Sequence, residues 1–172
     1  SRALEEEMAL LRRAAEMLAS AAIRGRLQGR EYVVLHDGSP AGQRLQALLT
    51  NAGARVREMK YEQREAQAGE ELSARLIVVN PPADWPLEPL QPAAVVWEKP
   101  AGDRAARKGM ERGAAGEGGR LHLVADSGVV SQWLLVEALN QGWKGRFDAV
   151  SLASLPALLE PLLKAPPEPL AE

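Results

Sequence analysis

Residues 32–60 read YVVLHDGSPAGQRLQALLTNAGARVREMK, and this stretch decides the fold. It begins with a short apolar run and a glycine-containing turn, and Ser39 and Pro40 then suit the first positions of a helix. A β-rich run follows that helix directly. A strand, a helix and a second strand in this order predict parallel pairing, because parallel strands need a crossover connection. Such sheets place their chemistry at the carboxyl ends of the strands, where Asp37 lies.

The composition of the chain limits the classes of function. Its 172 residues, 46% of them hydrophobic, fit one domain with an appendage. A formal charge of −2 gives no field that would attract nucleic acid or an anionic membrane. The absence of cysteine and the presence of only two histidines argue against disulfides and structural zinc. No apolar run reaches the roughly 20 residues that span a bilayer. We expect a soluble, cytoplasmic domain of a longer protein, without cofactor or metal.

Residues 1–29 form a helical pattern with apolar residues spaced alternately four and three apart. These seam residues are Leu4, Met8, Leu11, Ala15, Leu18 and Ala22. Within this segment the predicted helix ends at about residue 28. It fits either an amphipathic helix packed on its own domain or a parallel coiled coil. We expect the coiled coil, joining two protomers, because a short helix needs a partner to be stable in water.

The rest of the chain alternates strands and helices. The predicted strands cover residues 32–35, 55–59, 75–80, 121–125 and 147–152, and the predicted helices after the first unit cover 62–73, 129–140 and 155–164. The proline-rich segment 81–119 interrupts this order and contains one more apolar run, Ala93–Trp97. Residues 30–165 therefore predict a doubly wound α/β domain with a parallel sheet of five strands, or six if that run is included. Residues 166–172 predict a linker.

Three stretches resemble the CheY-like receiver domain of response regulators. YVVLHDGSPAGQRLQALLTNAGARV, from residue 32, looks like the start of that family. LHLVADSGVVSQWLLVEALNQGW, from residue 121, is similar to its fourth strand and helix, and FDAVSLASLPALLEPLLKA, from residue 147, to its last strand and helix. The resemblance implies a receiver-like fold within a larger two-component signalling protein, such as a sensor histidine kinase, whose partners are other signalling domains.

The resemblance assigns the receiver site residue by residue. The acidic pair of the family falls on His36 and Asp37, the phosphoacceptor aspartate on Asn80, and the Ser/Thr after the fourth strand on Ser127. The conserved lysine before proline has no match after the last strand, and only Lys99 supplies a Lys-Pro pair. Phosphoryl transfer needs a carboxylate nucleophile and a metal held by carboxylates. We therefore expect a degenerate receiver that has no catalytic residue and accepts no phosphate.

The same residues also have purely structural interpretations. Asp37 can accept hydrogen bonds from nearby loop amides, and Asn80 can close a turn before Pro81. Ser127 can cap the next helix, with Asp126 as competitor. His36 is expected to pack rather than to act as a base.

Two other features leave alternatives open. A basic cluster, formed by Arg104, Arg107, Lys108 and Arg112, is either a solvated face or a contact for phosphate or an acidic partner. A nucleotide- or cyclic-dinucleotide-binding domain is the competing class, and a sixth strand would favour it. Against it, the first turn lacks the G-x-G-x-x-G pattern, and Pro40 offers no amide to a phosphate. No hydrolase motif is present, and nucleic acid is not expected as a partner.

Overall fold

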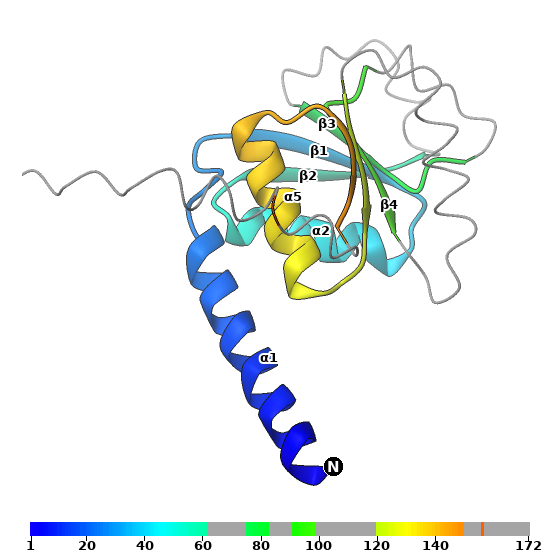
Figure 1. Ribbon diagram of the computed structural model, residues 1–172. Coiled ribbons are helices and arrows are strands. Elements are labelled where there is room, and N and C mark those ends of the chain that lie inside the picture. The colour runs from blue at the N-terminus through cyan, green and yellow to red at the C-terminus, as the bar shows by residue number, and fades with distance from the viewer. Residues whose placement is uncertain (62–74, 83–90, 99–119, 150–155, 157–172) are drawn as a thin grey trace, which may run out of the picture.

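The computed structural model describes residues 1–61, 75–82, 91–98, 120–149 and 156, and within them six parallel strands form one sheet (Figure 1). The strands are β1 (Glu31–His36), β2 (Arg55–Lys60), β3 (Arg75–Val79), β4 (Ala94–Glu98), β5 (Leu121–Ala125) and β6 (Gly145–Asp148). Their order in the sheet is β2-β1-β3-β4-β5-β6. The predicted doubly wound α/β architecture is confirmed, and of the two predicted strand counts the described residues have the larger, six.

The strand order places a topological switch point between β1 and β3. The first five strands have the order 2-1-3-4-5 that is typical of flavodoxin-like folds, and β6 extends the sheet beyond β5. The apolar run inside the proline-rich segment is β4, an internal strand that pairs with β3 on one side and β5 on the other. The last strand, β6, begins two residues before the predicted start and ends at Asp148.

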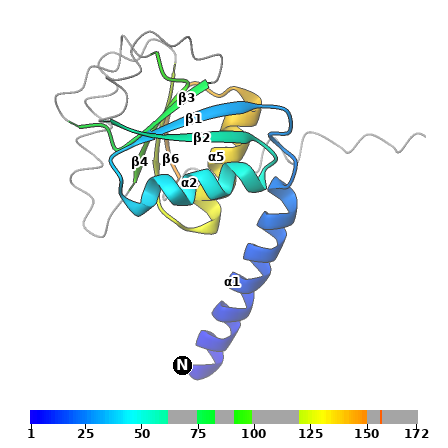
Figure 2. The ribbon, with the colours of Figure 1, turned by 180° about the vertical axis from the view of Figure 1, so that it is seen from behind.

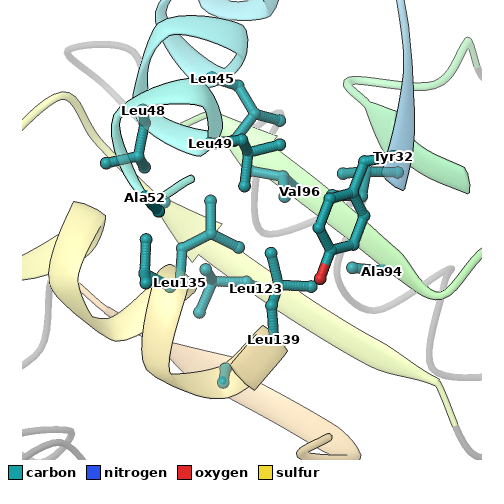
Figure 3. Close-up of a cluster of buried hydrophobic side chains, with 14 of the residues drawn as sticks. Tyr32, Leu45, Leu48, Leu49, Ala52, Ala94, Val96, Leu123, Leu135 and Leu139 are labelled. Atoms are coloured by element: carbon teal, nitrogen blue, oxygen red, sulfur yellow. The ribbon is translucent and has the colours of Figure 1, made fainter. Parts of the chain in front are cut away.

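Two helices, α2 (Pro40–Asn51) and α5 (Val129–Gln141), cover the same face of the sheet. Their leucines meet the strands in one continuous core (Figure 3), whose members include Leu45, Leu49, Val96, Leu123, Leu135 and Leu139. The opposite face of β1, β2 and β3 carries a second, smaller cluster around Leu35 and Val78. The core is mainly aliphatic, as the scarcity of aromatic residues requires, although Tyr32 is buried within it.

The two crossovers on this face have opposite hands. The β1–α2–β2 connection runs toward one edge of the sheet, and the β5–α5–β6 connection runs toward the other. Because both helices lie on one face, only one connection can have the right-handed form that nearly all parallel crossovers take. The β5–α5–β6 unit therefore extends the five-stranded order at β5, and the handedness of its connection is opposite to that of the β1–α2–β2 unit.

The ends of the helices follow local sequence signals. Ser39 and Pro40 begin α2 as predicted. The N-cap of α5 is Gly128, so Ser127 is not the capping residue. Gly142 ends α5 in a left-handed conformation with a φ of 68°, which glycine adopts without steric cost.

The first helix, α1 (Arg2–Ile23), projects away from the sheet domain (Figures 1 and 2). It was predicted to continue to about residue 28, but it ends at Ile23, because Arg24 has an extended ψ of 123° and Gly25 follows with a φ of 75°. A turn then carries Leu27 into the core, where it is fully buried. Among the described residues, the end of α1 contacts the domain, with Ala19 and Ile23 buried on the α5 side. Among the described residues, no helix has both the length and the apolarity to traverse a bilayer.

Two arginines after α1 hold the carboxyl-terminal half of α5. Arg26 donates from Nε and from an Nη atom to the two carboxylate oxygens of Glu137, both at 2.7 Å, and Glu137 is fully buried. The pKa of Arg26 is raised by its hydrogen bonds with Glu137, despite the opposing effect of burial. Arg30 donates to the carbonyl oxygens of Leu139 and Asn140 at 2.7 and 2.9 Å. These bonds neutralise the carboxyl end of α5 and fix α1 to it.

The outermost strands of the sheet differ from the inner ones. The inner strands β3, β4 and β5 are almost entirely buried. In contrast, β2 presents Arg55, Arg57 and Lys60 to solvent, and only Met59 is buried. The other outer strand, β6, is four residues long and largely exposed. The predicted helices 62–73 and 155–164 and the linker lie outside the described residues, except that Pro156 is helical.

Candidate functional site

The candidate site lies at the carboxyl edge of β1 and β3, at the switch point of the sheet. The strands are registered so that Leu35 lies opposite Val78. Asp37 and Asn80 each follow two residues beyond this pair. The prediction that both residues lie at the carboxyl edge of the sheet is therefore correct, and they follow neighbouring strands.

His36 is a packing residue whose ring lies against the backbone of α2. It is 1% exposed, and a Cβ atom added to Gly42 would lie 2.4 Å from its Cγ. Its Nδ1 accepts a hydrogen bond from the Gly38 amide at 2.9 Å. Its Nε2 lies 2.5 Å from Oε1 of Glu58, a contact that does not meet the criteria for a hydrogen bond. Both ring nitrogens therefore face protein groups.

Asp37 closes the turn between β1 and α2. Its Oδ1 accepts a hydrogen bond from the Ser39 amide at 3.0 Å. Burial acts to raise the pKa of Asp37, but hydrogen bonding from Ser39, the Asp37 amide and the charge of His36 together lower the pKa below its ordinary value. Asp37 thus behaves as a loop acid that stabilises its own turn.

This lowered pKa predicts a small acid-sensitive contribution to stability. Because the folded-state pKa lies below the unfolded value of roughly 3.9, the ionised carboxylate favours the folded state. The contribution is complete above that value and is lost as the pH falls through the folded pKa. We expect Asp37→Asn to be less stable than the native protein at pH 7 by this contribution, and the difference between the two proteins to shrink as the pH falls below about 4. Urea unfolding of both proteins between those pH values measures it, and parallel profiles would contradict it.

Asn80, the residue after β3, is hydrogen-bonded to β4. It has a φ of 47°, in the left-handed region that asparagine tolerates better than most residues. Its amide donates to the Val96 carbonyl at 3.0 Å, and its side-chain Oδ1 accepts from the Glu98 amide at 2.9 Å. The side-chain oxygen that would replace a phosphoacceptor carboxylate is thus engaged with the backbone of the neighbouring strand.

The turn after β5 is built like the turn after β1. Oδ1 of Asp126 accepts hydrogen bonds from the Gly128 amide at 2.7 Å and from the hydroxyl of buried Ser131 at 2.8 Å. Ser127 itself is exposed, and its carbonyl accepts from the side chain of Gln132 at 3.0 Å. Asp126 thus stabilises this turn by accepting a backbone hydrogen bond, as Asp37 does in the turn after β1.

A small cavity lies between α2 and α5 at the same edge. It has a volume of about 50 Å³ and is lined by residues of β3 and β4 and by the end of β5. Arg44 and Glu98, which form an ion pair, also line it, together with Ser127. A larger groove, of about 830 Å³, separates α1 from α2 and the start of α5. It is lined by polar residues such as Arg12, Arg44 and Gln132 and by apolar ones such as Ile23, Leu48 and Trp133.

Two residues at the switch point were missed by sequence analysis. The side chain of Lys60 lies over the first turn, with its Cε 3.7 Å from the place where a Cβ on Gly38 would be. The hydroxyl of Tyr61 donates to the carbonyl of Val79, and burial, then the charge of Asp37, raises the pKa of this phenol. Their position was available in the sequence, because β2 ends at the same edge as β1.

The structure also fixes which strands carry the remaining predicted residues. Counting along the sheet, β4 is the fourth strand and ends at Glu98, whereas β5 is the fifth and leads to Ser127. Ser127 therefore follows the fifth strand, although the resemblance matched it to the fourth. Lys99 and the basic cluster of Arg104, Arg107, Lys108 and Arg112 lie outside the described residues. Within the described part of the chain, no three His, Asp or Glu side chains gather where they could hold a metal ion.

The predicted seam of α1 faces solvent. Leu4, Met8, Leu11 and Leu18 are each more than half exposed, and Ala15 is half-buried. Dimerisation through this seam stays a prediction. No family model, curated protein or solved structure matches the chain.

Proposed function

We propose that this chain is a non-catalytic regulatory and interaction domain of a larger signalling protein, a degenerate receiver that accepts no phosphate. One observation carries the proposal. The turns that lead into α2 and α5 are closed on their own aspartates, since Asp37 accepts from the Ser39 amide and Asp126 from the Gly128 amide. Carboxylates and amides that would otherwise meet a metal or a phosphate satisfy each other.

The remaining groups at the switch point support the same proposal. A phosphoacceptor needs a carboxylate at the end of β3, but Asn80 stands there and its oxygen binds the backbone of β4. A magnesium site needs several oxygen ligands, and His36 replaces one carboxylate of the acidic pair. β4 ends at Glu98 and is followed in the sequence by Lys99, and β5 is followed by Asp126 and Ser127. The Ser/Thr that the receiver family has after its fourth strand and the lysine that it has after its fifth strand are therefore both missing.

The proposal is tested by offering the protein a phosphoryl donor. With acetyl phosphate and Mg²⁺, we expect the intact mass of the chain to stay unchanged, and beryllofluoride with Mg²⁺ to leave the melting temperature unchanged. Asn80→Asp restores only the missing nucleophile, so this variant is expected to stay unphosphorylated as well, because the metal ligands remain incomplete. An authentic active receiver, treated in parallel, shows that the reagents work. A magnesium-dependent gain of one phosphoryl group by the native chain would overturn the proposal.

The second candidate is a nucleotide- or cyclic-dinucleotide-binding domain. It is favoured by the sixth strand and by the groove of about 830 Å³, a size that suits a small ligand. Against it, the amides of Gly38 and Ser39 already donate within the first turn, and Pro40 has no amide to offer a phosphate. A rise in melting temperature with nucleotides or cyclic dinucleotides, without magnesium-dependent phosphorylation, would favour this candidate over the first.

The proposed role includes self-association in the cytoplasm through α1. In the described part of the chain the domain contacts the end of α1, and the seam residues Leu4, Met8, Leu11 and Leu18 are exposed. Pairing two seams in a coiled coil would bury these side chains. Arg26 and Arg30 hold the end of α1 against α5. A change in the orientation of the paired α1 helices would therefore be transmitted to α5 and to the sheet domain through these hydrogen bonds.

A further inference from the structure

The helix α1 carries a second apolar stripe beside the predicted seam. The seam, or first stripe, consists of Leu4, Met8, Leu11, Ala15, Leu18 and Ala22. The second stripe lies one residue earlier at each of the same positions, and its apolar members are Ala3, Leu10, Ala14, Met17 and Ala21. Glu7 is the charged residue at the remaining position. The second stripe therefore has the same heptad spacing as the first.

The two stripes point in different directions. One residue advances an α-helix by about 100°, so the stripes lie roughly a quarter turn apart. A two-stranded coiled coil covers the first stripe and leaves the centre of the second in water. Leu10 is 70% exposed and Met17 is 60% exposed, so nothing in the described part of the chain covers these side chains either. The second stripe needs a further partner to be buried.

A four-helix bundle supplies neighbours in the two directions that the stripes require. In such a bundle each helix runs nearly parallel or antiparallel to two neighbours, around a core of heptad positions. Seen along the helix axis, the directions to these two neighbours are about 90° apart. The alanines of the second stripe let helices approach closely. Most of α1 extends clear of the sheet domain (Figures 1 and 2), which leaves room for other helices along it.

We propose that two α1 dimers associate through the second stripe, so that four copies of this chain form one four-helix bundle. This inference rests on the proposed dimerisation through the first stripe. The charge of α1 favours other copies over an anionic lipid surface, because its three basic residues, Arg2, Arg12 and Arg13, are outnumbered by four acidic ones, Glu5, Glu6, Glu7 and Glu16. Helices that lie on anionic membranes carry an excess of basic residues instead.

The mass of the complete chain in solution tests the inference. By sedimentation equilibrium we expect the mass of four chains. Leu10→Glu with Met17→Glu should halve this mass to that of two chains, because these changes affect only the second stripe. Leu11→Glu with Leu18→Glu should reduce the mass fourfold, to that of one chain. Ala9→Glu, on the charged side of α1, is the matched control and should leave four chains. Circular dichroism of each variant confirms that the sheet domain is folded.

The possible outcomes separate this inference from the proposed function. A native chain with the mass of two chains at every concentration overturns the bundle and leaves the dimer intact. A native chain with the mass of one overturns both. Four chains that survive Leu10→Glu with Met17→Glu would also overturn the inference, because the association would then not use the second stripe.

Discussion

Replacing Arg26 with Met is expected to lower the free energy of unfolding by about 3 kcal/mol, the lower end of the cost of leaving one partner of a buried ion pair without the other, because the Arg26 side chain itself is 38% exposed. Glu137 is fully buried, and its two carboxylate oxygens each accept a hydrogen bond from Arg26 at 2.7 Å. After the change, only the Gln141 side chain, at 3.1 Å, still donates to this carboxylate in the described structure. Guanidinium unfolding at neutral pH, followed by tryptophan fluorescence, measures the loss.

A second arginine provides the matched control. Arg55 lies 3.7 Å from Glu31, and the two side chains are 87% and 50% exposed. Arg55→Met removes the same charge and adds the same side chain, but we expect a loss below about 1 kcal/mol, because solvent screens the pair. Equal losses for the two variants would show that Glu137 is not a buried, paired charge in solution. If Arg26→Met frees α1 from α5 but leaves the stability of the sheet domain unchanged, then Arg26 serves only to attach α1 to α5.

Gly42→Ala is expected to destabilise the domain by about 2 kcal/mol, even though alanine is the better helix former. The helix propensity gain is about 1 kcal/mol, whereas overpacking a rigid site costs about 1–3 kcal/mol, and here the upper end applies. The added Cβ would lie 2.4 Å from Cγ of His36. The ring has little room to retreat, because it is buried between the Gly38 amide and Glu58. Thermal and urea unfolding of the variant measure the change.

A double-mutant cycle separates this clash from other effects of Gly42→Ala. His36→Ala removes the ring, so in that background the added methyl group has space and only the propensity gain remains. We therefore expect Gly42→Ala to be neutral or stabilising when His36 is already alanine. Gln43→Ala, on the exposed side of α2, is the control for helix propensity. The interpretation fails if Gly42→Ala costs the same in both backgrounds.

The sequence predicted most of the fold because its signals are local. Ser39 and Pro40 begin α2, and Gly142 ends α5, each through contacts within a few residues. The end of α1 was predicted too late, since the periodic apolar pattern continues past Gly25 while the backbone turns there. The membership of Ala94–Glu98 in the sheet was left open because flanking prolines mask an internal strand, and only its pairing with β3 and β5 establishes it.

The candidate site was predicted in part, for a related reason. Parallel pairing alone places Asp37 and Asn80 at one edge. It does not show how far their side chains are already engaged, since the acceptor role of Asn80 depends on the position of Glu98. The ion pair of Arg26 and Glu137 joins residues 111 positions apart and carries no local signal at all. Interactions of this kind become visible only when the helices are packed.

The charged outer strand β2 has a consequence for colloidal behaviour. A strand at the border of a sheet exposes backbone donors and acceptors that can recruit another chain into an amyloid-like stack. The strand exposes three cationic side chains, Arg55, Arg57 and Lys60, against one carboxylate, Glu58, and this positive excess would repel a second β2 from an identical molecule. Concentrated preparations should therefore resist fibril formation along this border, and more so at low ionic strength, where the repulsion reaches furthest.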